Sequence, residues 1–228
     1  MATDDGAYQY KREHGDDFGR TYFRRFDGVA ISSIGLGTYL GDPTDAVDAR
    51  YRDAIATALE NGVNVVDTAS NYRCQRSERA VGRAIEDADV SRDAVFVSTK
   101  GGFLPFDGSR PEDPGEYVKR EFVDSGLVER EDLARGSHCI APDFIDNQLD
   151  QSLDNLGVEE IDLYYVHNPE TQLHARSREE VYDQLEATFT RLEERAAAGD
   201  ISKYGVATWN ALRVPEGDDE DLSLPEIV

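Results

Sequence analysis

One pattern recurs along this chain: a short apolar run, a small loop and a helix with clear ends. Residues 62–82 (GVNVVDTASNYRCQRSERAVG) show it most plainly, because a valine-rich run ends in Asp67 and a capped helix begins at Ser77. Alternating strands and helices build a parallel sheet with the helices outside it, so we expect an α/β fold. The same reasoning predicts strands at 32–36, 95–99, 161–166 and 201–208, and helices at 42–60, 143–156 and 179–198.

Ionisable residues follow three of the predicted strands. Asp67, Lys100 and His167 stand where these strands end, and Tyr72 lies in the loop after the first of the three. In (β/α) barrels the carboxyl ends of several strands carry the chemistry, whereas a doubly wound sheet gathers its ligand contacts at one switch point. The pattern therefore favours a (β/α)8 TIM-barrel fold, with about five of the eight barrel strands present.

These four side chains suit the reduction of a carbonyl group. A free phenol has a pKa near ~10 and is a poor acid at neutral pH, so we expect the Lys100 ammonium to lower the pKa of Tyr72. Asp67 would keep that lysine charged and in place, and His167 could donate a hydrogen bond to the carbonyl oxygen. Since none of the four forms a redox centre, the hydride would come from a nucleotide cofactor.

The sequence around these positions resembles the aldo-keto reductases. Asp67, Tyr72, Lys100 and His167 follow one another in the contexts VVDTA, NY, VSTK and LYYVHNPE. Further agreement comes from GLGT at 35–38, SE at 77–78, VG at 81–82 and GV at 205–206. The resemblance covers about residues 20–228. It implies a carbonyl reductase that uses NADPH or NADH on small aldehydes or ketones.

The resemblance also assigns roles to individual residues. It makes Tyr72 the proton donor, Lys100 and Asp67 the pair that tunes it, and His167 the group that orients the substrate. For the cofactor, it places Gly37, Thr38 and Asp67 along the nicotinamide ribose. Where the family has Ser-Asn after the fifth strand, this chain has Thr208, with Asn210 two residues on, as groups for the nicotinamide carboxamide.

The domain organisation is predicted to be simple. Residues 1–20 are expected to form a polar, loosely ordered tail, and residues 21–228 a partial barrel domain that opens with a hairpin turning at Asp27-Gly28. The long insertion 101–141 is expected to contain a short helix at 116–124 and to cover the mouth as a substrate lid. His138-Cys139 within it lacks a second pair for a metal, so we expect it to pack there.

The end of the sequence resembles an interrupted barrel. After the fifth predicted strand, the SLPE run at 223–226 is a capping box, which opens a helix. In the aldo-keto reductases, the strands and loops beyond this point grip the pyrophosphate and the adenosine phosphate of the cofactor. The resemblance therefore predicts a truncated reductase that keeps its four catalytic residues and binds NADPH weakly.

Composition limits the partners. The net charge is −23, and only four of the 24 basic residues are lysines. This charge repels nucleic acids and anionic lipids, and acidic, lysine-poor surfaces are typical of a high-salt cytoplasm. Cys74 and Cys139 have no metal-like spacing, and no apolar run reaches the ~20 residues of a membrane span or forms a signal peptide. We expect a cytoplasmic, halophilic protein without a metal, and leave its oligomeric state open.

Two other functions stay open at this point. Lys100 at a strand end could form a Schiff base, as in barrel lyases. Alternatively, the chain could be a non-catalytic barrel that senses a cofactor or binds a partner, or an inert remnant. A short-chain dehydrogenase is excluded, because it needs Tyr and Lys four residues apart on one helix and the sequence holds no such pair.

Overall fold

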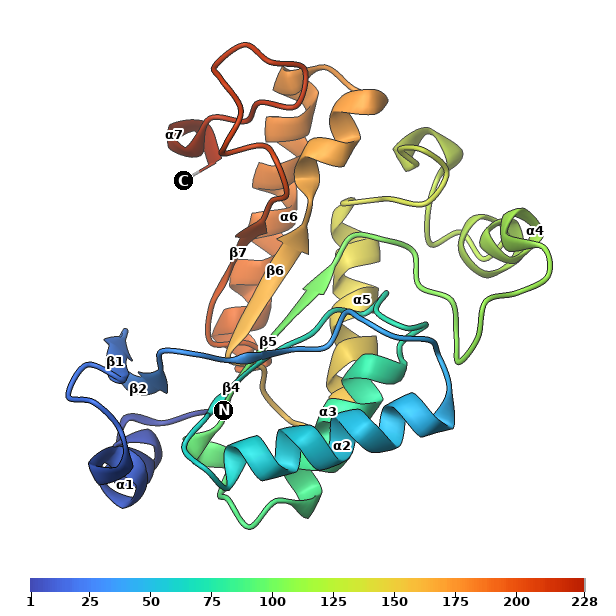
Figure 1. Ribbon diagram of the computed structural model, residues 1–228. Helices are drawn as coiled ribbons and strands as arrows, with labels where there is room; N and C mark the ends of the chain where they lie inside the picture. Colours follow the sequence, from blue (N-terminus) through green and yellow to red (C-terminus); the bar gives the residue numbers. More distant parts are fainter. Residues whose placement is uncertain (228) are drawn as a thin grey trace.

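A five-stranded parallel sheet organises the computed structural model, which describes residues 1–227 (Figure 1). Its strands lie side by side in chain order: β3 (Leu36–Gly37), β4 (Val65–Asp67), β5 (Phe96–Gly101), β6 (Leu163–His167) and β7 (Tyr204–Ala207). The main helices alternate with them: α2 (Asp45–Leu59), α3 (Arg76–Asp87), α5 (Pro142–Leu156) and α6 (Arg178–Ala198). Helix α3 packs against α2 and α5, and α5 also packs against α6. The predicted α/β fold is confirmed; Val228, the last residue of the predicted domain, lies outside the described residues.

The helix ends follow local sequence signals. Helix α6 begins with a capping box, in which Ser177 and Glu180 satisfy each other's main-chain N–H groups, and it ends at Gly199 with φ of 90°. Helix α2 begins later than predicted, because Thr44 is extended and occupies the N-cap position. Pro43 therefore precedes the helix instead of forming its first turn.

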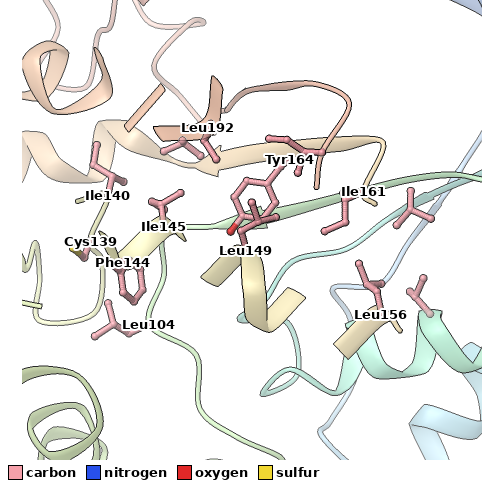
Figure 2. Packing of buried hydrophobic residues seen from close by; sticks show 14 of the residues in the cluster. Leu104, Cys139, Ile140, Phe144, Ile145, Leu149, Leu156, Ile161, Tyr164 and Leu192 are labelled. Atoms are coloured by element: carbon pink, nitrogen blue, oxygen red, sulfur yellow. The ribbon is translucent and has the colours of Figure 1, made fainter. Parts of the chain in front are cut away.

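The core lies between the sheet and the helices α2, α3, α5 and α6. Figure 2 shows the ring of Tyr164 from β6 packed near Leu149 and Ile145 of α5, with Leu192 of α6 close by. All four side chains are buried, and every residue of β5 is buried as well. This packing fixes β5 and β6, the strands that carry two of the candidate catalytic residues.

The N-terminal segment corrects one prediction. Residues 1–20 are not a loose tail, because α1 (Asp4–His14) forms there and is capped by the Thr3 side chain. Ala7 and Tyr10 are buried on its inner face, and the Tyr10 hydroxyl donates a hydrogen bond to the Leu59 carbonyl. Most other positions of α1 face solvent, so a mostly polar sequence is compatible with this helix.

A hairpin covers the amino ends of the strands. Strands β1 (Phe23–Phe26) and β2 (Val29–Ser32) form the predicted hairpin around Asp27-Gly28, both of which have positive φ. Ser32 belongs to this hairpin, so the first strand of the large sheet is shorter than the predicted 32–36. The Asn64 side chain, just before β4, joins the hairpin to the sheet through hydrogen bonds with main-chain groups on both sides.

The remaining segments leave the sheet at its other end. In Figure 1 the arrows of β5 and β6 point toward the end from which the loop bearing α4 departs and near which α7 (Leu224–Ile227) lies. Helix α4 (Pro114–Val118) continues into a π-helical turn at Lys119–Val123, which confirms the predicted short helix. The described part also contains four short 3-10 helices: Gly15–Asp17, Arg92–Ala94, Arg130–Asp132 and Pro169–His174.

Candidate active site

The pairing of β4 with β5 brings Asp67 and Lys100 together. Lys100 Nζ donates hydrogen bonds to Asp67 Oδ2 and to the Thr68 carbonyl, both at 2.7 Å. The lysine is 7% exposed, whereas the Asp67 side chain is 41% exposed and also accepts a hydrogen bond from Ser98 Oγ at 2.7 Å. Burial lowers the pKa of Lys100, and the Asp67 charge acts against this shift. The Asp67 carboxylate is therefore held in place by Lys100 and Ser98, and the Lys100 ammonium lies buried against it.

Tyr72 lies beside this pair. Its ring centroid is 5.2 Å from Lys100 Nζ and 5.1 Å from the ring of Tyr39. Burial, followed by the negative charge of Asp67, raises the pKa of Tyr72 to about 12. The predicted lowering was wrong, because both of these effects disfavour the phenolate.

His167 completes the group from the end of β6. Its ring centroid lies 5.8 Å from that of Tyr72, and the imidazole is almost fully buried. Burial, with the charge of Lys100 next in importance, lowers the pKa of His167 to about 3. The imidazole is therefore neutral at physiological pH. Its Nδ1 atom is buried and has no hydrogen-bond partner among residues 1–227.

Two of the three residues predicted at the nicotinamide ribose, Gly37 and Thr38, differ in their surroundings. Gly37 is exposed, pairs with Asp67 across β3 and β4, and has open space where a Cβ would stand. Thr38 is fully buried, and its hydroxyl bonds to Thr68 Oγ1 at 2.8 Å and to the Asp67 carbonyl at 3.3 Å. The Thr38 hydroxyl is thus already engaged within the protein.

Thr208 and Asn210 follow β7 at the same end of the sheet, since His167 pairs with Ala207. Thr208 is half-buried. The Asn210 side-chain amide donates to Glu220 Oε2 at 2.6 Å, and its main-chain N–H donates to a carboxylate oxygen of Glu170 at 3.1 Å. The Asn210 amide is therefore engaged within the protein too.

Sequence reasoning gave no role to two residues that support the site. Ser98 lies two positions before Lys100 on β5, hence on the same face of the strand, and this spacing was the available signal. Glu78 is fully buried and accepts hydrogen bonds from Thr99 Oγ1 at 2.6 Å and from Asn155 Nδ2 at 2.9 Å. Burial raises the pKa of the Glu78 carboxyl group.

Among residues 1–227, no three His, Cys, Asp or Glu side chains come together as a metal site. No helix in the described part of the chain combines the length and the apolar character needed to cross a bilayer.

Comparison with known proteins identifies the family. The sequence model described as the aldo/keto reductase family matches residues 33–220. The chain belongs to the aldo/keto reductase family. The chain is 32% identical over 142 residues to glycerol 2-dehydrogenase (NADP(+)) of Saccharomyces cerevisiae, and the match covers 62% of the chain and 31% of that relative.

Two further relatives cover more of the chain. The NADH-specific methylglyoxal reductase of Escherichia coli is 26% identical over 193 residues, which cover 82% of the chain and 52% of that enzyme. A crystal structure of an aldo/keto reductase from Klebsiella pneumoniae in complex with NADP and acetate matches with a TM-score of 0.56 at 21% identity, over 87% of the chain and 56% of that structure. The latter likeness shows the fold alone. The chain spans about a third to a little over half the length of these relatives.

Proposed function

We propose that this chain carries the site of an NAD(P)H-dependent carbonyl reductase that acts on small aldehydes or ketones. The arrangement of Tyr72 beside the Lys100–Asp67 pair, with His167 at the next strand end, carries the proposal. Membership of the aldo/keto reductase family supports it, as do the names of the relatives, which are dehydrogenases and reductases.

The residues present fit a nicotinamide nucleotide. Gly37 leaves space next to Asp67, and the half-exposed carboxylate of Asp67 can accept hydrogen bonds from ribose hydroxyls. Thr208 would hydrogen-bond to the carboxamide, and Asn210 could join it only by leaving Glu220. When bound, the cofactor supplies a hydride to the carbonyl carbon. NADPH is the first candidate and NADH the second, because relatives of both kinds are similar to this chain.

Tyr72 is the proposed proton donor to the carbonyl oxygen. With its pKa raised to about 12, the phenol stays protonated at neutral pH and holds the proton that the oxygen needs. As the proton leaves, the Lys100 ammonium, 5.2 Å from the ring, stabilises the phenolate that forms. Asp67 holds the lysine in this position.

His167 is the proposed orienting group. A pKa of about 3 makes it a neutral imidazole, so it acts as a hydrogen-bond donor to the substrate oxygen and not as a general acid. Its burial at the end of β6 restricts the ring, which favours one substrate orientation.

The Schiff-base alternative is disfavoured by the surroundings of Lys100. A lysine nucleophile needs a free, neutral amine, whereas this amine is engaged in two hydrogen bonds of 2.7 Å, one to a carboxylate. Borohydride treatment with a carbonyl compound would trap a covalent adduct on Lys100 if the lyase hypothesis were right.

The test is a cofactor-oxidation assay. Absorbance at 340 nm is followed with NADPH or NADH and a panel of small aldehydes and ketones in molar KCl. We expect turnover that is lost in Tyr72→Phe and kept within about threefold in Tyr39→Phe, a matched loss of hydroxyl on the neighbouring ring. A Tyr72→Phe variant that retains most of the rate would contradict the proposal. A folded chain without turnover would favour the non-catalytic barrel.

A further inference from the structure

A second buried histidine, His138, lies against the main chain of His167. Its Nε2 atom is 2.7 Å from the His167 carbonyl oxygen, and its Nδ1 atom is 2.9 Å from the side-chain nitrogen of Gln172. The same amide nitrogen is 3.0 Å from the carbonyl oxygen of His138 itself. Both His138 and Gln172 are fully buried. The three groups form one closed hydrogen-bond network beside the candidate site.

This network allows one protonation state of His138. The His167 carbonyl can only accept a hydrogen bond, so Nε2 of His138 must carry a proton. The His138 carbonyl also only accepts, so the Gln172 amide must present its NH2 group there, and its second N–H is directed at Nδ1. Nδ1 must therefore be a bare acceptor. Burial lowers the pKa of His138 to about 4, in agreement with a neutral imidazole.

The backbone around His138 allows its ring to approach the His167 carbonyl closely. Residues Phe103 and His138 pair in an antiparallel bridge, and the Cys139 N–H donates to the Gly102 carbonyl at 2.8 Å. A Cβ at Gly102, where φ is 150°, would lie 2.8 Å from the His167 carbonyl oxygen and 3.2 Å from His138 Nε2. Only glycine fits there. On the far side, Cys139 is anchored in the hydrophobic core (Figure 2).

We propose that His138 is a positioning residue that sets the place of the His167 ring. This inference rests on the proposed function, because it assigns His138 to the orienting of His167. The long segment after β5 holds the His167 main chain through His138, and Gln172, in the 3-10 helix that follows β6, fixes the tautomer. Phe103 packs against one side of the His167 ring and restricts its position, since the two ring centroids lie 5.1 Å apart.

The first test is independent of activity. Nitrogen-15 NMR of the histidine side chains, with His138 identified by its absence in His138→Gln, should show a neutral Nε2–H tautomer at pH 7. The ring signals of His167 should move in His138→Leu and stay near their wild-type positions in His138→Gln, which can still donate to the carbonyl and accept from Gln172. An Nδ1–H tautomer, an imidazolium at pH 7, or unmoved His167 signals in the leucine variant would overturn the proposal.

The second test uses turnover. We expect kcat to fall about tenfold in His138→Leu and to return to within about twofold of wild type in His138→Gln, with the Kd for NADPH unchanged in both. If His138→Leu does not fold, Gln172→Leu replaces it, with the same expected fall in kcat and a loss of the single tautomer. An unchanged kcat in the folded variant contradicts the positioning role. Absence of turnover in the wild type contradicts the proposed function instead, and the NMR result then decides on His138 alone.

Discussion

Replacing Lys100 by Met tests the electrostatic part of the proposed chemistry. The side chain is only 9% exposed, and Met has a similar length and volume, so the core should accept it. What is lost is a positive charge 5.2 Å from the ring of Tyr72 and two hydrogen bonds, to Asp67 and to the Thr68 carbonyl. We therefore expect slower proton transfer in a folded protein.

The size of the loss follows from these distances. At an effective dielectric constant of about 20, a unit charge about 5 Å away stabilises a phenolate by about 3 kcal/mol. The charge of Asp67 opposes the phenolate in both proteins and so does not change this difference. Screening by water at the partly exposed Asp67 side of the site reduces the difference to about 1.5–2.7 kcal/mol, or about 10- to 100-fold in rate. The expected fall is 10- to 100-fold.

Single-turnover cofactor oxidation, which isolates the chemical step, measures this fall. The matched control is Lys119→Met, because Lys119 makes an equally short pair with Asp124, at 2.7 Å, on the exposed surface. Thermal unfolding of each variant checks the fold. A Lys100→Met protein that is folded and reacts within twofold of wild type would refute the role of the ammonium.

Three more outcomes are expected. The proposed reduction needs Tyr72 protonated, Lys100 charged and His167 neutral. In a pH–rate profile, kcat should therefore fall as the pH drops toward about 3, and on the alkaline side it should fall first as Lys100, whose pKa is lowered by burial, loses its charge, before Tyr72 titrates near about 12. Asn64→Leu leaves three buried main-chain partners unpaired and should lower the free energy of unfolding by about 3–5 kcal/mol in urea titrations. Because the net charge is −23, raising KCl from 0.1 to 2 M should raise the unfolding midpoint by about 5 °C or more; an unchanged midpoint contradicts the halophilic prediction.

The repeated strand–helix pattern was sufficient to predict the sheet. Strands such as β5 and β6 are buried along most of their length, so their apolar runs are continuous and easily recognised in the sequence. Helix α1 was not predicted because it contains few apolar residues. It is held in place by the buried Ala7 and Tyr10 and by its N-terminal cap, and two buried residues are too few to give a clear hydropathy pattern.

The sequence was sufficient to predict which residues come together at the candidate site, but not the pKa values of their side chains. Parallel neighbouring strands end at the same edge, so Asp67, Lys100 and His167 had to come together. The pKa of Tyr72 depends on how deeply the phenol is buried and on which charge lies nearer, and neither is written in the sequence. The network around His138 was not predicted for a similar reason, because its partners are a main-chain carbonyl and a glutamine that only folding brings close.

The turn after Tyr72 shows most clearly what sequence reasoning could not reach. Three successive residues, Arg73, Cys74 and Gln75, have φ between 50° and 68°, and none is glycine. Left-handed conformations cost such residues about 1 kcal/mol each, so the surrounding structure has to enforce them. A sequence without glycine or asparagine at these positions gives no warning of such a turn.

The contacts of this turn explain why it persists and what it does. The buried Arg73 guanidinium donates to the Asp42 carbonyl and pairs with Asp48, while the Gln75 side chain donates to the Phe106 carbonyl. The turn is thus tied both to the start of α2 and to the segment after β5. Because these contacts directly follow Tyr72, they restrain the loop next to the proposed proton donor. The same contacts that offset the strain therefore preorganise the proposed proton donor.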